Sequence, residues 1–176
     1  MLSLKIDIDI KVPKVKAADL INEIADEVKK DHSRRIDKGE GINGTLKSLK
    51  ASTIAKKQSD GMLKPSTPLY ATGKMSKLKD YKRATDKDLT AIVGVRESRQ
   101  DIATYHQEGT SGYKITPKNA THLSFVTENG VQIRKSVNHP GVPKREWFGL
   151  TKEMESKADK MTEKFSLIKK ISNDVI

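Results

Sequence analysis

Residues 2–12 alternate between apolar and polar side chains without a break. Leucine, isoleucine or valine occupies every even position from Leu2 to Val12, and a polar residue occupies every odd position from Ser3 to Lys11. Successive side chains of a β-strand point to opposite faces, so this period of two is typical of a strand with one buried face. Pro13 has no amide hydrogen for a strand ladder. The sequence therefore predicts a strand over residues 2–12.

Two longer segments change to the helical period. Residues 17–36 carry an apolar stripe, with acidic residues mainly in the first half and basic residues in the second half, which complements the helix dipole. Residues 150–171 repeat apolar side chains at spacings of three and four, and Thr151 is suited to cap the first turn. The sequence therefore predicts an N-terminal and a C-terminal helix.

Several shorter elements are predicted between these helices. Residues 89–96 alternate and indicate a strand, and residues 98–108 indicate a short helix that stops at Gly109. Residues 69–81 are compatible with one more short helix.

Residues 121–127 and 131–137 are typical of a β-hairpin. A two-residue loop at Asn129 and Gly130 would put Phe125 and Ile133 on opposite faces. A three-residue loop over residues 128–130 pairs these two residues on one face and places Gly130 at a left-handed position. We prefer the three-residue loop for this reason.

The positive charge is concentrated in one segment. The chain has 34 Lys and Arg against 23 Asp and Glu, a formal net charge of +11. Residues 38–83 hold 11 of the basic residues and 3 of the acidic ones, together with many Gly, Pro, Ser and Thr residues. This composition predicts either a long, partly ordered basic excursion from the folded body or a solvated loop. Five lysines are candidates for contact with an acidic partner or DNA: Lys47, Lys50, Lys56, Lys57 and Lys64.

Enzymatic and metal chemistry find little support in the residue pattern. The chain has no cysteine, which excludes disulfides, thiolate metal sites and cysteine nucleophiles. The histidines do not have metal-ligand spacing and are interpreted as surface or interface groups, namely His32, His106, His122 and His139. No apolar run approaches the roughly 18 residues of a membrane-spanning helix, and the N-terminus lacks a signal-peptide pattern. We expect no catalysis, no metal or cofactor, and no membrane partner.

Four stretches occur in an order that is typical of one family. Leu49–Lys57 reads LKASTIAKK, Leu69–Met75 reads LYATGKM, Tyr105–Thr110 reads YHQEGT and His139–Leu150 reads HPGVPKREWFGL. With the hairpin and the terminal helix, this ordered set resembles the tailed-phage virion-morphogenesis, or tail-completion, family over nearly the whole chain. Glu146 and Met75 stand where that family often has Pro and Leu.

The resemblance implies a structural protein of the phage neck or tail end, a subunit of a ring that is commonly sixfold. Such rings complete the tail or join it to the head, so the implied partners are further copies of the chain and neighbouring neck or tail proteins. The implied location is the virion, assembled in the host cytoplasm. The implied fold is a single α+β domain over residues 1–176, with a small antiparallel sheet packed on helices, which agrees with the elements predicted above.

Seven residues in the last two stretches are candidates for contacts that hold the fold or the assembly: Tyr105, His106, Gly109, Pro143, Arg145, Trp147 and Phe148. Tryptophan and arginine are frequent anchors of protein interfaces. Trp147 and Phe148 have a second interpretation, in which they fill the core where the sheet meets the last helix.

Two other functions are open at this point. The charge would suit a basic nucleic-acid-binding module, although the chain lacks a helix-turn-helix signature and paired RNA-binding aromatics. Lysine dominates the basic segment, which favours nonspecific contact with phosphates. A hydrolase or metal enzyme would conflict with the residue spacings.

Overall fold

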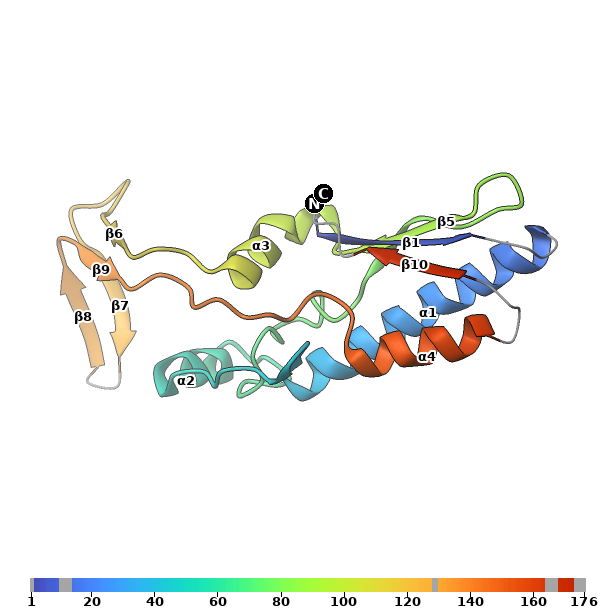
Figure 1. Ribbon diagram of the computed structural model, residues 1–176. Helices are drawn as coiled ribbons and strands as arrows, with labels where there is room; N and C mark the ends of the chain where they lie inside the picture. The colour runs from blue at the N-terminus through green and yellow to red at the C-terminus, as the bar shows by residue number, and fades with distance from the viewer. Residues whose placement is uncertain (1, 10–13, 128–129, 164–167, 173–176) are drawn as a thin grey trace.

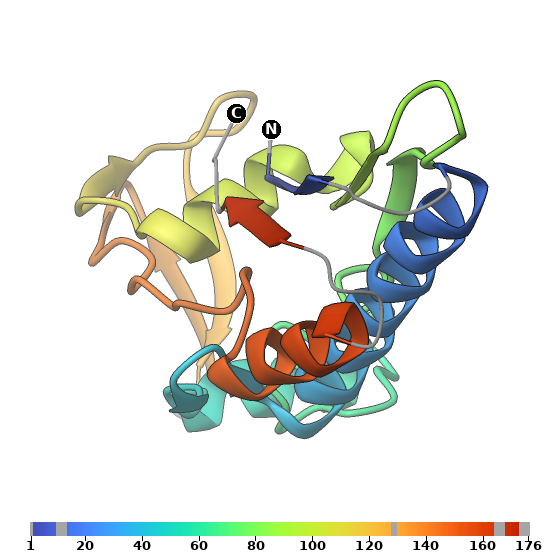
Figure 2. The same ribbon diagram turned by 45° about the vertical axis from the view of Figure 1, so that its right-hand side comes forward.

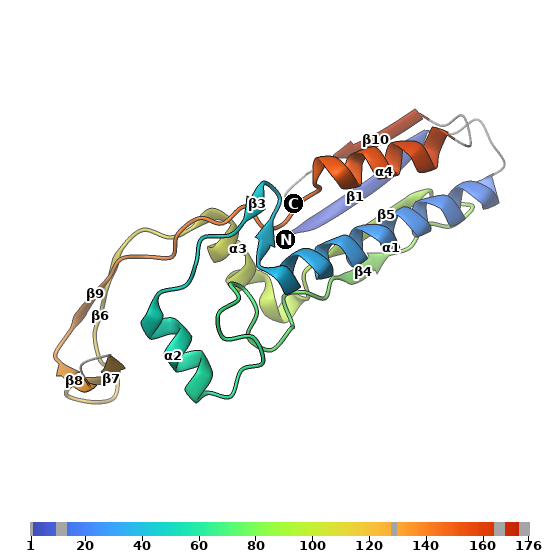
Figure 3. The ribbon, with the colours of Figure 1, turned by 90° about the horizontal axis from the view of Figure 1, so that it is seen from below.

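A computed structural model of the chain describes residues 2–9, 14–127, 130–163 and 168–172. Its body has two layers, a four-stranded antiparallel sheet in the order β10–β1–β5–β4 and two helices that cover one face of it (Figures 1 and 3). The strands are β1 (Ser3–Asp9), β4 (Lys79–Lys82), β5 (Thr90–Gly94) and β10 (Ile168–Ser172), and the helices are α1 (Lys14–Lys38) and α4 (Lys152–Glu163). The predicted fold class is confirmed: α+β, with a small antiparallel sheet packed against an N-terminal and a C-terminal helix.

The remaining elements lie on the long connections of the body. Between α1 and β4 come β2 (Glu40–Gly41), β3 (Gly44–Thr45) and α2 (Ala51–Ser59). A 3-10 turn (Glu97–Arg99) leads into α3 (Gln100–Glu108). Four short strands follow before α4, namely β6 (Tyr113–Ile115), β7 (Leu123–Thr127), β8 (Gly130–Arg134) and β9 (Val137–His139).

The alternating N-terminal pattern forms the central strand. Leu2, Leu4 and Ile6 are buried and belong to the same core as the apolar stripe of α1. Each buried leucine or isoleucine contributes about 1.5–3 kcal/mol relative to an exposed one. Backbone bonds to β5 on one side and to β10 on the other fix β1 in the middle of the sheet.

The predicted C-terminal helix is too long. It begins as expected, because the Thr151 Oγ1 accepts a hydrogen bond from the Met154 amide at 3.1 Å. However, α4 ends at Glu163, and residues 168–172 form β10 along the edge of β1. The free edge of β1 offers this segment a ladder of backbone hydrogen bonds, and this non-local partner overrides the local helical spacing. Phe165, which the prediction placed in the helix, lies outside the described residues.

The predicted hairpin forms as β7–β8, but it does not join the main sheet. Its preferred register is also wrong. Thr127 pairs with Gly130, and Phe125 lies opposite Gln132 instead of Ile133. The prediction assumed that one face would be buried and would gather the apolar residues. Both faces carry exposed side chains, so no core enforces that register.

Residues 110–142 leave the body as two antiparallel stretches that carry β6–β9 and, at the far end, β7–β8 (Figure 1). We call this segment the arm. In Figure 2 it recedes behind the body, and α3 marks the point where it departs. The arm points away from the end of the body where α1 begins (Figure 1).

The basic segment 38–83 is held to the body at several points. Leu46 and Met75 are buried in the core, and β4 forms an edge of the sheet. Between these anchors, α2 stands away from the two layers (Figure 3). Residues 69–78 form turns that lead into β4, so the short helix predicted over residues 69–81 is wrong.

His32 lies in the core, and its interpretation as a surface group is wrong. The side chain is only 2% exposed, and its ring centroid lies 5.5 Å from that of Trp147 and 6.0 Å from that of Phe148. The Nε2–H donates to the Met75 carbonyl oxygen at 2.9 Å. Position 32 follows Val28 by one turn on the apolar stripe of α1, which explains its burial.

The burial of His32 predicts a loss of stability in acid. Desolvation lowers the pKa of the folded imidazole from 6.5 to about 4, so the unfolded state binds more protons between these pH values. The stabilisation is fully present above pH 6.5 and is lost as the pH falls toward 4, by an amount on the order of 3 kcal/mol.

Substitution of His32 by glutamine tests this expectation. H32Q keeps a donor near Met75 and does not titrate, so we expect its free energy of unfolding to fall less than that of the wild type over this pH range. Urea unfolding at neutral pH and near the lower pKa measures both proteins. Equal losses in the two proteins would contradict the assignment.

Candidate functional site

Residues 145–149 run as an irregular strand between two helices and are held by polar side chains from both. On one side, Arg35 of α1 donates to the carbonyl oxygens of Trp147 and Gly149 at 3.0 and 3.1 Å. The Arg35 Nε also donates to Asp31 at 2.8 Å, so its buried charge is compensated. Buried backbone groups outside a sheet or helix need partners of this kind.

On the other side, Gln107 of α3 makes three hydrogen bonds to the same strand. Its Oε1 accepts from the amides of Trp147 and Phe148 at 3.2 and 3.1 Å, and its Nε2 donates to the Phe148 carbonyl at 3.2 Å. Trp147 and Phe148 are buried against His32 as a consequence. Both side chains fill the core at the junction of sheet and helix, which is the second of their two interpretations.

The base of the arm is fixed to the body by backbone hydrogen bonds at and just before the start of this strand. The Arg145 amide donates to the His106 carbonyl at 2.8 Å, and the Thr110 amide donates to the Val142 carbonyl at 2.9 Å. Gly109 allows this approach, because its φ is +79° and a Cβ there would lie 2.9 Å from the Lys144 amide nitrogen. At Gly141, with φ +87°, a Cβ would lie 2.0 Å from the Thr110 carbonyl oxygen.

The predicted interface residues of the stretch 105–110 thus lie beside those of the stretch 139–150, at the base of the arm. The Arg145 Nη1 lies 3.3 Å from the His106 Nδ1, and Arg145 is only 9% exposed. Burial, and secondarily the Arg145 charge, lower the pKa of His106. Tyr105 and Pro143 are exposed beside them.

The five predicted lysine contacts fall into two sets. Lys57 is buried and donates to the carbonyls of Lys64 and Thr67, and its burial lowers its pKa. Lys56 pairs with Asp60 and Lys64 pairs with Asp37 within the chain. Lys47 and Lys50 are exposed and have no ion-pair partner among the described residues.

The far end of the arm exposes large apolar side chains on both faces of a two-stranded ribbon. Val131 is 65% exposed and Ile133 is 60% exposed, and both lie on β8. Phe125 of β7 is partly exposed, and Tyr113 of β6 stacks on His139 of β9 with ring centroids 4.8 Å apart. An isolated two-stranded ribbon is marginally stable in water, so this surface is suited to burial against another chain.

Sequence reasoning missed several residues on which this site depends. Gln107 and Arg35 look like ordinary helix-surface residues, since the irregular strand that they hold lies far away in the chain. Gly141 lies in a quoted motif and has Pro140 before it, a combination that indicates a turn. The exposure of Val131 and Ile133 has no signal in the sequence, because an apolar strand is normally assigned to the core.

The described residues offer no group of three or more His, Asp or Glu side chains that could hold a metal ion. Among the helices in the described ranges, none is long and apolar enough to cross a bilayer.

Comparison of the chain with protein-family models, with curated proteins and with solved structures gives no match. The function is therefore argued from the geometry and from the sequence resemblance.

The close approach at Gly109 predicts a large cost for any side chain there. G109A puts a Cβ 2.9 Å from two backbone atoms in a backbone region that only glycine adopts readily, so we expect a loss of about 2–3 kcal/mol. G61A is the matched control, since Gly61 also has a positive φ but open space around it, and about 1 kcal/mol is expected there. Urea unfolding measures both, and equal losses would contradict the role of the approach.

The clamp by Gln107 predicts a second loss of stability. Q107L removes the partner of the Phe148 amide and carbonyl, while the Trp147 amide keeps its bond to the Arg145 carbonyl. Each unmet buried group costs about 1–3 kcal/mol. Q58L, on the exposed surface of α2, is the matched control and should change stability by less than about 0.5 kcal/mol. A small effect of Q107L in thermal unfolding would contradict a stabilising role of the Gln107 hydrogen bonds.

Proposed function

We propose that the chain is a structural subunit of the neck or tail end of a tailed phage, and that it assembles with copies of itself into a ring. The observation that carries the proposal is the ribbon at the end of the arm, with apolar side chains exposed on β7 and β8. The ring completes the tail or joins it to the head. The virion is the proposed location, after assembly in the host cytoplasm.

The geometry of the arm supports a head-to-tail contact. The arm extends from one end of an elongated body (Figure 1), and it carries the exposed side chains of Tyr113, Phe125, Val131 and Ile133. Contacts between two different surfaces of identical subunits generate rings when the rotation closes. Burial of Val131 and Ile133 in such a contact removes from water apolar area that a single subunit leaves exposed.

Two of the stretches that resemble tail-completion proteins meet at the base of the arm. These stretches, residues 105–110 and 139–150, lie side by side and are joined by backbone hydrogen bonds. They hold the base of the arm, so the residues that carry the resemblance also orient the proposed contact surface.

Serine substitution of the exposed ribbon residues tests the proposal. We expect native mass spectrometry and light scattering to show concentration-dependent oligomers of the wild type and a monomer for the double variant V131S/I133S. Both residues are mostly exposed in one subunit, so the melting temperature of the monomeric variant should change by only about 2 °C or less. L63S is the matched control, because Leu63 is 83% exposed on a different loop and should not affect assembly.

A wild type that remains a monomer at high concentration would contradict the ring. Loss of assembly in L63S to the same extent as in V131S/I133S would contradict the role of the arm. Tight, steeply salt-dependent binding of DNA by the monomer would favour the alternative function, a basic nucleic-acid-binding module.

A further inference from the structure

A hollow of about 720 Å³ lies at the base of the arm, between two walls that are far apart in sequence. One wall is formed by residues 47–50, 52 and 53, which end in the first turn of α2. The other is formed by residues 139–143 and Arg145, where the arm returns to the body. We call this hollow the basal groove. Its size falls in the range of roughly 300–1,000 Å³ that is usual for ligand sites.

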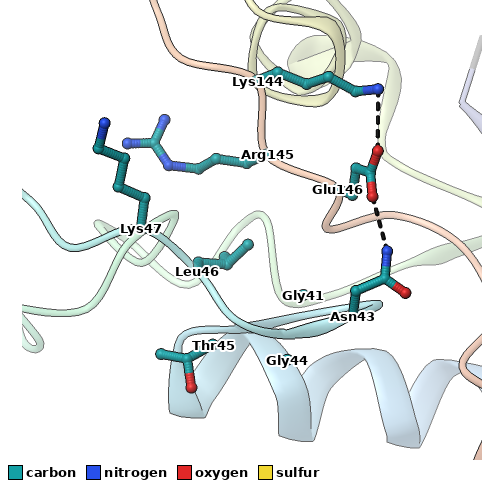
Figure 4. Close-up of a pocket in the computed structure, with 9 residues that line it drawn as sticks. All are labelled: Gly41, Asn43, Gly44, Thr45, Leu46, Lys47, Lys144, Arg145 and Glu146. Atoms are coloured by element: carbon teal, nitrogen blue, oxygen red, sulfur yellow. Dashed lines mark hydrogen bonds and ion pairs between the residues drawn. The ribbon is translucent and has the colours of Figure 1, made fainter.

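The ionisable groups around the basal groove are all basic. They are Lys47, Lys50, His106, His139 and Arg145, and no Asp or Glu is among the residues that line it. The nearest acid in sequence, Glu146, turns to the other side, where it accepts from Lys144 at 3.0 Å and Asn43 at 2.8 Å. Figure 4 draws an adjoining hollow, which Glu146 lines and which shares Lys47 and Arg145 with the basal groove. It shows the Arg145 side chain extending away from Glu146, toward Lys47.

Arg145 is the decisive residue, because it is a buried cation without a buried anion. It is only 9% exposed, its Nε has no hydrogen-bond partner among the described residues, and its Nη1 makes only long contacts to His106 and to the Pro143 carbonyl. Buried charges are normally paired, since desolvation of an unpaired ion costs several kcal/mol. Burial accordingly lowers the pKa of Arg145.

Arg35 provides an internal comparison. It is buried to a similar degree, at 2% exposure, but it pairs with Asp31 at 2.8 Å and donates to two carbonyl oxygens. The chain therefore supplies a carboxylate to one buried arginine and none, within the described residues, to the other.

The first turn of α2 is also suited to an anion, although its Thr53 amide already donates to the Lys50 carbonyl. Lys50 is its N-cap residue and makes no side-chain capping bond. The first amides of a helix lack partners within the helix, and its N-terminus favours negative charge. Here Lys47 and Lys50 bring positive charge to that position, so an anion in the groove would neutralise the lysines and satisfy the helix end together.

We propose that the basal groove binds an acidic peptide segment of a neighbouring protein, with an Asp or Glu carboxylate paired to Arg145 and flanked by Lys47 and Lys50. A peptide fits better than nucleic acid for two reasons. A narrow side chain can reach the guanidinium of Arg145, a residue that is only 9% exposed, whereas the phosphates of a duplex lie on a broad convex surface. The groove also has apolar walls, including Leu49 and Val142, which suit a peptide with apolar residues between its acids. This proposal rests on the proposed assembly function in one respect, namely that the peptide belongs to a neighbouring protein of the assembly.

Fluorescence anisotropy with short labelled peptides tests the proposal on the full chain. The probe is a peptide of alternating glutamate and leucine, and its control has glutamine in place of glutamate. We expect the acidic peptide to bind at least about tenfold more tightly than the glutamine peptide, as loss of charge-assisted hydrogen bonds implies. Equal binding of the two peptides would overturn the proposal.

Three variants locate the binding. R145Q should weaken binding of the acidic peptide by about tenfold or more. K47S/K50S should weaken it several-fold, and it covers the case in which R145Q does not fold, because both lysines are exposed and unpaired among the described residues. K152Q/K160Q removes the same charge from the exposed surface of α4 and should leave affinity unchanged. An equal loss in this control would show that only net charge matters, which overturns the proposal.

Two further measurements separate this site from the assembly function and from DNA. V131S/I133S changes the end of the arm and leaves the groove intact, so it should still bind the acidic peptide even though it does not assemble. Loss of peptide binding in that variant would overturn a site confined to one subunit. A labelled DNA duplex that displaces the peptide, and whose binding also depends on Arg145, would assign the groove to phosphate instead.

Discussion

Two long polar side chains, Gln107 and Arg35, hold one irregular strand, and the rest of the site depends on them. Residues 145–149 belong to no sheet, yet they carry the only tryptophan of the chain into the core. Such a strand can be buried only if its backbone groups find partners. Gln107 supplies three bonds from α3, and Arg35 supplies two from α1. The clamp thereby joins α1 to α3 and fixes where the arm begins.

The position of this strand also determines the electrostatics of the arm base. Its backbone bond to His106 brings Arg145 beside that histidine and beneath the loop that carries Lys47. The positive charge of the chain therefore divides into two kinds. Lysines such as Lys56 and Lys64 find acids within the chain, while the cations of the basal groove remain without them among the described residues. A net charge of +11 is thus less informative than the placement of a few cations.

Half of the main sheet, β1 and β5, and the two helices that cover it could be predicted from sequence, because their signals are local and agree with each other, whereas β4 and β10 were not predicted. The alternation from Leu2 and the apolar stripe of α1 each fix an element and its buried face. The predictions are wrong where a contact with a segment distant in sequence determines the secondary structure or the register. Ile168 and Ile171 fit a helical spacing, but β1 offers them an edge. The β7–β8 register could not be inferred from apolar matching, because neither face meets the core. For the site, the motif residues near the arm base could be selected from sequence, whereas the clamp by Gln107 and Arg35 could not.

Hydrogen exchange of the assembled protein tests the central claim most directly, namely that the ribbon at the end of the arm becomes an interface between subunits. Amides of an exposed two-stranded ribbon open readily in a monomer and are protected when another chain covers them. The account predicts that residues 123–134 exchange much more slowly in the assembled wild type than in a dilute monomer, while the β1–β5 ladder changes little. An oligomer in which these residues exchange as fast as in the monomer would contradict it.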